Sequence, residues 1–334
     1  MRTLLLALAI PVFAQPHLEN ARVETRAART LDAAFHAIAN AAAAPAWIGY
    51  ALPRAPGPDE DGSCKAWLEP GRANPVPPSS TAHLEGATEF YVFLRIENAQ
   101  VNRIRTFSLD CSIDAGGLTV YWLTGVNPAQ SVALLDSFAG AAERRVSNGA
   151  IAAIALTRDN SADSALDRLA EASQPEQTRR QAMFWMGVAR GRHGYESLVK
   201  ILANDPSDRV REHAVFALSR SQDSGAIPQI VRAAREDPSA RVRGQALFWL
   251  AQTAQQRFSE EAIRRAIKQD PETEVKKKAV FALTQMRNGG GVPILIEVAR
   301  NNANPAVRKQ AMFWLAQSKD PRAVKFFEEV LSRP

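Results

Sequence analysis

The C-terminal half of the chain repeats one pattern of apolar residues about every 32 residues. The segment QAMFWM at residues 181–186 returns as HAVFAL, QALFWL, KAVFAL and QAMFWL, and its central phenylalanines lie 32, 32, 33 and 32 residues apart. These phenylalanines are Phe184, Phe216, Phe248, Phe281 and Phe313. A fixed period of this length indicates a solenoid, because each repeat can bury its apolar face only against its neighbours.

Each repeat contains two helical stretches. In the second stretch apolar residues recur at steps of four, as at Val210, Ala214 and Leu218, and an Asp-Pro pair precedes it in three repeats. The first stretch is shorter, as in residues 227–234, and a weaker copy of the pattern surrounds Ala152. Residues 143–334 therefore predict an α-solenoid of about six repeats of 32 residues, with an atypical first repeat as a cap.

Charged residues follow the same period. A basic residue occupies the same position of the second helix in five repeats, and in three repeats an aspartate lies in the turn before this helix. We expect each basic residue to pair with this turn aspartate of its own or the next repeat. Exposed ion pairs of this kind are worth only about 0 to 1 kcal/mol each, so they would fix the stacking more than stabilise it. The basic residues are Arg179, Arg211, Arg243, Lys276 and Arg308, and the aspartates are Asp205, Asp237 and Asp270.

The repeated helical pair of residues 146–334 contains a turn aspartate, then Val-Arg, then Ala-Val-Phe-Ala-Leu or a variant of it. This pattern resembles the short bacterial HEAT-like repeats. The resemblance implies an Asp-Arg ladder between repeats. It also implies a non-catalytic scaffold that holds a partner along a curved surface, although some relatives bind bilins or nucleic acid.

Six further cations near the start of the second helices have no matching acid in register, and they favour a basic stripe for an anionic partner surface. They are Arg180, Arg209, Arg241, Lys277, Lys278 and Lys309. Tryptophan occurs only in alternate repeats, at Trp185, Trp249 and Trp314, with alanine between. Large side chains beside small ones indicate core packing, and a ligand-facing aromatic ladder is the alternative.

Residues 15–142 change from a helical to a strand-like pattern. Apolar residues recur at helical steps from Ala27 to Ile38, and residues 90–96 and 101–109 then alternate around the turn 97–100 as a β-hairpin does. Residues 47–52, 65–69 and 119–123 are shorter strand candidates, residues 53–62 and 70–80 are loops, and Asn127 caps a helix that starts with Pro128. We predict an α+β domain with a small, mainly antiparallel sheet.

Residues 1–14 are typical of a secretory signal peptide. Arg2 precedes an apolar stretch of ten residues and a small-residue cleavage site, and this stretch is shorter than the about 20 residues that a membrane span needs. We therefore expect an exported protein, periplasmic or extracellular, with no transmembrane anchor. An oxidising compartment favours a disulfide between the two cysteines, Cys64 and Cys111.

The chain of 334 residues carries a formal net charge of +6, which hides an asymmetry. Residues 15–142 hold nine basic and thirteen acidic side chains, whereas residues 143–334 hold 31 and 22. The N-terminal part is therefore acidic and the solenoid is basic, which favours an anionic partner for the solenoid.

Catalytic motifs are missing from the sequence. The five histidines are scattered without metal-ligand spacing, and a tight turn accounts for Asp110 and Asp114. The aromatic residues of the N-terminal part indicate a core, with a shallow binding cleft as an alternative. We expect no cofactor and favour an adaptor that binds a protein along the concave, cation-rich face of the solenoid. One alternative is an enzyme or ligand carrier with its site in the N-terminal domain. Another is a binder of an anionic envelope polymer. Export argues against a nucleic-acid partner.

Overall fold

The computed structural model describes residues 16–56, 65–69, 88–253 and 256–332. The predicted signal peptide, Cys64 and most of the predicted loops lie outside these ranges, so they stay predictions. Contacts divide the chain into two compact units, Met1–Leu169 and Ala170–Pro334. The sequence places the start of the solenoid at residue 143, whereas these contacts group the first helices after that point with the N-terminal unit.

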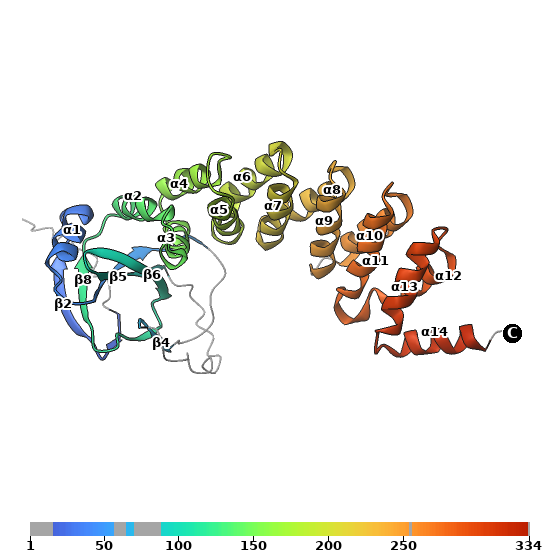
Figure 1. Ribbon diagram of the computed structural model, residues 1–334, viewed down its shortest axis with the longest axis horizontal. Helices are drawn as coiled ribbons and strands as arrows, with labels where there is room; N and C mark the ends of the chain where they lie inside the picture. Colours follow the sequence, from blue (N-terminus) through green and yellow to red (C-terminus); the bar gives the residue numbers. More distant parts are fainter. Residues whose placement is uncertain (1–15, 57–64, 70–87, 254–255, 333–334) are drawn as a thin grey trace, which may run out of the picture. The chain divides into compact units, whose positions relative to one another are not determined.

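The N-terminal unit is built on two β-sheets (Figure 1). The larger has the strand order β2-β8-β3-β5-β6, with β2 at Arg22–Ala27, β8 at Thr119–Thr124, β3 at Ala46–Pro53, β5 at Glu89–Glu97 and β6 at Gln100–Ser108. The smaller has the order β1-β7-β4, with β1 at Leu18–Glu19, β7 at Ser112–Asp114 and β4 at Lys65–Trp67. The β5–β6 hairpin is confirmed, with Asn98 and Ala99 at positive φ in its two-residue turn.

The prediction of a mainly antiparallel sheet is wrong, because the larger sheet is mixed. β3 pairs antiparallel with β5, and β5 with β6, but β8 pairs parallel with both β2 and β3. The smaller sheet is parallel throughout. Ala27, expected in a helix, ends strand β2, and helix α1 occupies Leu31–Ala41. β2 is a largely exposed edge strand of polar sequence, so it lacks the apolar alternation that would reveal a strand.

Aromatic side chains fill the core between the sheets. Trp47, Tyr91, Phe93 and Trp122 are at most 2% exposed and contact one another mainly edge to face, with ring centroids 5.6 to 6.4 Å apart. The indole N–H of Trp47 donates to Glu69 Oε1 at 2.9 Å. These side chains are core, as the sequence predicts.

Helices α2 (Pro128–Ala139), α3 (Arg144–Leu156) and α4 (Asn160–Ala170) follow the last strand. Asn127 accepts a hydrogen bond from the backbone N–H of Gln130 and so caps α2, with Pro128 at its first position, as predicted. α3 holds the weak repeat copy around Ala152 and packs on strand β6. It approaches closely at Gly149, where an added Cβ would overlap the carbonyl oxygen of Ile104.

The C-terminal unit is an α-solenoid. The second helices of successive repeats pack on one another in one row: α5 (Glu176–Ala189), α7 (Asp208–Arg220), α9 (Ala240–Gln252), α11 (Thr273–Thr284) and α13 (Pro305–Ala316). The first helices are α6 (Gly191–Asn204), α8 (Ala226–Glu236), α10 (Gln256–Gln269) and α12 (Val292–Asn301), and α14 (Pro321–Leu331) follows. In Figure 1 the row of second helices forms the lower side of this stack, and we call its exposed side the second-helix face.

Candidate functional site

Arginines and aspartates join successive repeats, as the periodicity predicts. Arg211 donates from Nε and Nη2 to both carboxylate oxygens of Asp237 at 2.9 and 3.0 Å, and Arg243 makes the same bidentate pair with Asp270 at 2.8 and 3.1 Å. Arg179 pairs with Asp205. Each of these three arginines therefore contacts the turn aspartate of the following repeat.

The turn aspartates also shape the start of the second helices. Asp237 Oδ1 accepts the backbone N–H of Ser239 at 2.8 Å, and Asp205 and Asp270 accept the N–H two residues on at 2.9 Å. The arginine of each pair also donates to backbone carbonyls of its own turn, as Arg243 does to Asp237 O at 3.0 Å. One carboxylate thus fixes a turn and links two repeats.

The expectation that these pairs are exposed is wrong. Arg211, Arg243, Asp237 and Asp270 are all at most 9% exposed, because neighbouring repeats cover them. The hydrogen bonds that Arg211 donates to Asp237 raise the pKa of this arginine above its ordinary value, despite the opposing effect of desolvation. A buried pair is costly to break from one side, since the remaining charge is left without its partner.

The ladder changes at its C-terminal end. The turn residue after α12 is Asn302, which still accepts the N–H of Asn304 at 3.0 Å but carries no charge. The base in register with it is Lys276, and no ion pair of Lys276 is found in the described part of the chain. Arg308 donates to Asn302 O at 2.7 Å instead of to an acid. At this junction lysine therefore replaces the arginine of the earlier repeats, and asparagine replaces the aspartate that would pair with it.

A row of aromatic rings runs along the second-helix face. Phe184 stacks on Phe216 and Phe248 stacks on Phe281, each with centroids 6.0 Å apart. Trp249 lies 4.8 Å from Phe216 of the preceding repeat, and Trp314 lies 5.0 Å from Phe281 in the same way. The rings therefore form one nearly continuous ladder.

The tryptophans in alternate repeats are half-buried. Trp249 and Trp314 contact Phe216 and Phe281 of the preceding repeats. The alanines that occupy the tryptophan position in those repeats, Ala217 and Ala282, are fully buried. The indole N–H groups of the two tryptophans are covered and have no acceptor among the residues described. The tryptophan rings thus pack against rings of the neighbouring repeat, as the core-packing interpretation predicts. They also belong to a row of aromatic rings, as the ligand-facing interpretation predicts.

The six candidate binding cations lie on the helices of this face, all but Lys277 exposed. The expectation that they lack acids is wrong for two of them, since Arg241 pairs with Glu212 and Lys277 Nζ lies 2.9 Å from Glu274 Oε1. The other four, Arg180, Arg209, Lys278 and Lys309, have no carboxylate partner within the described ranges.

Three of these cations meet at one cavity. It has a volume of about 510 Å³ and lies over α5, α7 and α9. Arg180, Arg209 and Arg241 line it together with the rings of Phe216 and Trp249. The remaining lining residues are Glu176, Glu212, His213 and Gln245. The cavity therefore combines exposed guanidinium groups with half-buried aromatic surface.

His213 is held neutral in this cavity. Burial lowers the pKa of the imidazole below its ordinary value, although the hydrogen bond to the backbone of Arg180 opposes this shift. Its Nε2 lies 2.8 Å from the carbonyl oxygen of Arg180, which can only accept, so Nε2 carries the proton. The residue fixes α7 against α5 and adds no charge to the site at neutral pH.

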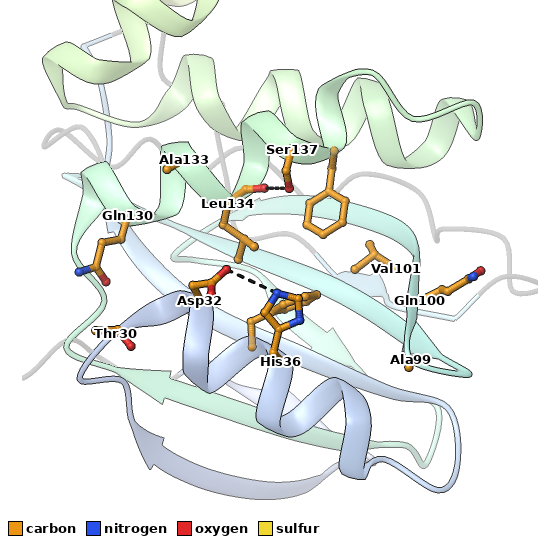
Figure 2. A pocket seen from close by; sticks show the side chains of 12 residues that line it. Thr30, Asp32, His36, Ala99, Gln100, Val101, Gln130, Ala133, Leu134 and Ser137 are labelled. Carbon is orange, nitrogen blue, oxygen red and sulfur yellow. Dashed lines mark hydrogen bonds and ion pairs between the residues drawn. The ribbon is translucent and has the colours of Figure 1, made fainter.

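The N-terminal unit has a separate cavity of about 760 Å³ between α1, α2 and the start of β6 (Figure 2). Phe35, Leu134 and Phe138 give it an apolar lining, and His36 Nε2 lies 3.5 Å from Asp32 Oδ1 at its edge. The aromatic residues that suggested a cleft do not line it; they are Trp47, Tyr50, Trp67, Tyr91 and Trp122. The sequence does not reveal this cavity, because its lining comes from three elements far apart in the chain.

The other residues considered for chemistry have structural roles. Asp114 is 4% exposed and accepts hydrogen bonds from Asn20 Nδ2 and the backbone N–H of Gly116 at 2.8 and 2.7 Å, as a turn residue does. Cys111 is buried, and its predicted partner Cys64 lies outside the described residues. Where the structure is described, no group of three or more His, Cys, Asp or Glu could hold a metal ion, and no helix is long and apolar enough to cross a membrane.

The fold of the C-terminal unit defines a protein with α-helical repeats. Residues 195–264 and 259–334 match the HEAT repeats family, so the solenoid contains HEAT repeats. No curated protein matches the chain.

Solved structures similar to this chain include three helical proteins. YibA of Escherichia coli is 20% identical, with 62% of this chain and 79% of that chain covered and a TM-score of 0.37. Kap95p in complex with RanGDP is 18% identical, with 62% and 32% covered and a TM-score of 0.40. The CpcE–CpcF complex of phycocyanin lyase from Nostoc sp. PCC7120 is 18% identical, with 61% and 87% covered and a TM-score of 0.31.

Proposed function

We propose that this protein is an exported, non-catalytic scaffold that binds a protein partner along the concave, second-helix face of its HEAT repeats. The observation that carries the proposal is the ladder of half-buried rings with exposed arginines and lysines beside it. Tryptophan and arginine are enriched at the energetic centres of protein interfaces, where a ring supplies apolar area and a guanidinium supplies directed hydrogen bonds. Export rests on the signal-like residues 1–14.

Two observations support a binding role over catalysis. HEAT repeats are a fold that often mediates protein interaction, and their match covers most of the second-helix face. Of the two residues that could have formed a catalytic pair, Asp110 lies in the turn before β7, and Asp114 ends β7 with its carboxylate already hydrogen-bonded.

Reversing the charge at Lys277, Lys278 and Lys309 tests the proposal. The full-length mature chain serves as bait for an envelope extract of its source organism, and proteins that it captures are then titrated against wild type and the Lys→Glu triple variant. We expect the triple variant to bind a captured partner at least about tenfold more weakly, which corresponds to about 1.4 kcal/mol.

A matched control changes the same charge elsewhere. Lys200 on α6, Lys268 on α10 and Lys325 on α14 are exposed lysines outside the second-helix row, and their Lys→Glu triple variant should bind as wild type does. Equal losses in both variants, with a steep fall in binding as salt rises, would contradict a protein-binding face and indicate an anionic polymer. Capture of no specific protein would also contradict the proposal.

A second candidate function, a ligand carrier in the N-terminal unit, is favoured by the apolar cavity of Figure 2. Its volume lies within the range of about 300 to 1,000 Å³ typical of small-molecule sites. The dye 1-anilinonaphthalene-8-sulfonate is a suitable probe because it brightens in apolar cavities. We expect Ala133→Trp, which fills the cavity from α2, to abolish most of this signal.

The control for this test is Ala37→Trp. Ala37 is exposed on α1 and does not line the cavity, so the added ring leaves the cavity open. Equal dye fluorescence from both variants, or none from wild type, would rule out the carrier function.

A further inference from the structure

The cavity over α5, α7 and α9 has an excess of one positive charge. Its lining includes three arginines and two glutamates, while His213 is neutral. Glu212 is already paired with Arg241, so this pair contributes little to a ligand. Arg180 and Arg209 are exposed and have no carboxylate partner in the described parts of the chain. The site therefore offers two guanidinium groups with free hydrogen-bond donors.

A guanidinium group at such a site is well suited to bind a carboxylate of a partner protein. The planar guanidinium matches a carboxylate through two parallel N–H···O bonds, which are charge-assisted and directional. The net charge of the lining balances about one carboxylate. A longer run of negative charge would meet the carboxylates of Glu176 and Glu212, which lie among the arginines. The arrangement thus disfavours a continuous polyanion and favours a single acidic group.

The aromatic part of the cavity favours an apolar or aromatic side chain next to the acidic group of the ligand. Phe216 and Trp249 contribute half-buried ring surface, 4.8 Å apart between centroids, from two neighbouring repeats. An apolar or aromatic side chain of a ligand would bury this surface and gain edge-to-face or stacked contacts. The volume of about 510 Å³ accommodates a large side chain with an adjoining acidic one.

We propose that this cavity binds a short acidic segment of a protein partner, in which one carboxylate binds Arg180 and Arg209 and a neighbouring apolar or aromatic side chain packs on Phe216 and Trp249. This inference rests on the proposed scaffold function and names the chemistry of the partner at one place on the second-helix face. It distinguishes that place from α11 and α13, where the candidate cations are the lysines Lys277, Lys278 and Lys309 and not arginines.

A random heptapeptide library displayed on phage tests the recognition directly, with the full-length chain as target. We expect the selected peptides to combine Asp or Glu with an aromatic or large aliphatic residue. Synthetic versions should bind wild type at least about tenfold more tightly than they bind the Arg180→Gln/Arg209→Gln variant. Both arginines are exposed, so this variant keeps its fold, which circular dichroism can verify.

The matched control is Lys309→Gln on α13. Lys309 occupies the same position in its helix as Arg180 does in α5 but does not line the cavity, and its loss should leave peptide affinity unchanged. Selected peptides without acidic residues, no enrichment at all, or an equal loss in Lys309→Gln would each overturn the inference. If a captured protein partner is lost on reversal of Lys277, Lys278 and Lys309 but unaffected by Arg180→Gln/Arg209→Gln, only this inference fails and the scaffold function stands.

Discussion

Asp237→Ala is expected to lower the free energy of unfolding of the HEAT-repeat unit by about 3 to 5 kcal/mol, the range for a buried ion pair broken from one side. The change removes both acceptors of Arg211, which is 9% exposed and would remain charged. It also removes the turn hydrogen bond to the N–H of Ser239. Urea unfolding followed by far-ultraviolet circular dichroism measures the loss.

Two variants separate the turn from the ion pair. Asn302→Ala removes the same turn hydrogen bond in the last repeat, where the turn residue is uncharged, and should cost only about 1 kcal/mol. Asp237→Asn keeps a turn acceptor but removes the charge, so its effect should lie between the other two. A cost for Asp237→Ala no larger than that for Asn302→Ala would show that the pair with Arg211 contributes nothing to stability.

The pairing in this ladder could be predicted from sequence, but its burial could not. Equivalent residues of a solenoid come into register, so a basic residue and an aspartate that recur with the same period must lie near each other. Their exposure depends on how closely the layers stack over the turn, which no single repeat encodes. The prediction of weak surface pairs therefore became a finding of buried, bidentate ones at Arg211 and Arg243.

The cavity over α5, α7 and α9 and the two unexpected ion pairs show a second limit on what the repeat period can predict. Arg241 pairs with Glu212 across a separation of 29 residues, which differs from the repeat length and so escapes a search in register. Likewise, Arg209 and Arg241 occupy one helical position but Arg180 occupies another, and only the packing of three helices brings them together. The repeat period predicts contacts between residues that recur at equivalent positions, whereas this cavity depends on residues that differ between repeats.

The N-terminal unit was predictable only where pairing is local. The hairpin of β5 and β6 follows from alternation on both sides of a short turn. The parallel pairing of β8 with β2 and β3 joins segments about a hundred and about seventy residues apart, and nothing in either segment specifies the partner. The mixed sheet therefore emerged only from the structure.

Gly149→Val is expected to destabilise the N-terminal unit by about 3 kcal/mol, at the upper end of the usual cost of overpacking. Helix α3 lies so close to β6 at this residue that an added Cβ would overlap the carbonyl oxygen of Ile104 and lie 2.8 Å from its Cβ. Valine has a higher helix propensity than glycine, so any loss of stability reports the overlap and not the helix itself. Amide hydrogen exchange should show reduced protection in α3 and β6.

The same experiment decides to which unit α3 belongs. The repeat pattern assigns residues 144–156 to the solenoid, whereas the contacts assign them to the N-terminal unit. Gly140→Ala is the control, because a Cβ there meets nothing within 4 Å, and it should change stability by less than about 0.5 kcal/mol. If Gly149→Val instead reduces protection in α7, α9 and α11 and leaves β6 unaffected, α3 is the first helix of the HEAT-repeat unit and the boundary lies near residue 142. Loss confined to α3 and β6 places the start of the independently stable solenoid after Leu169.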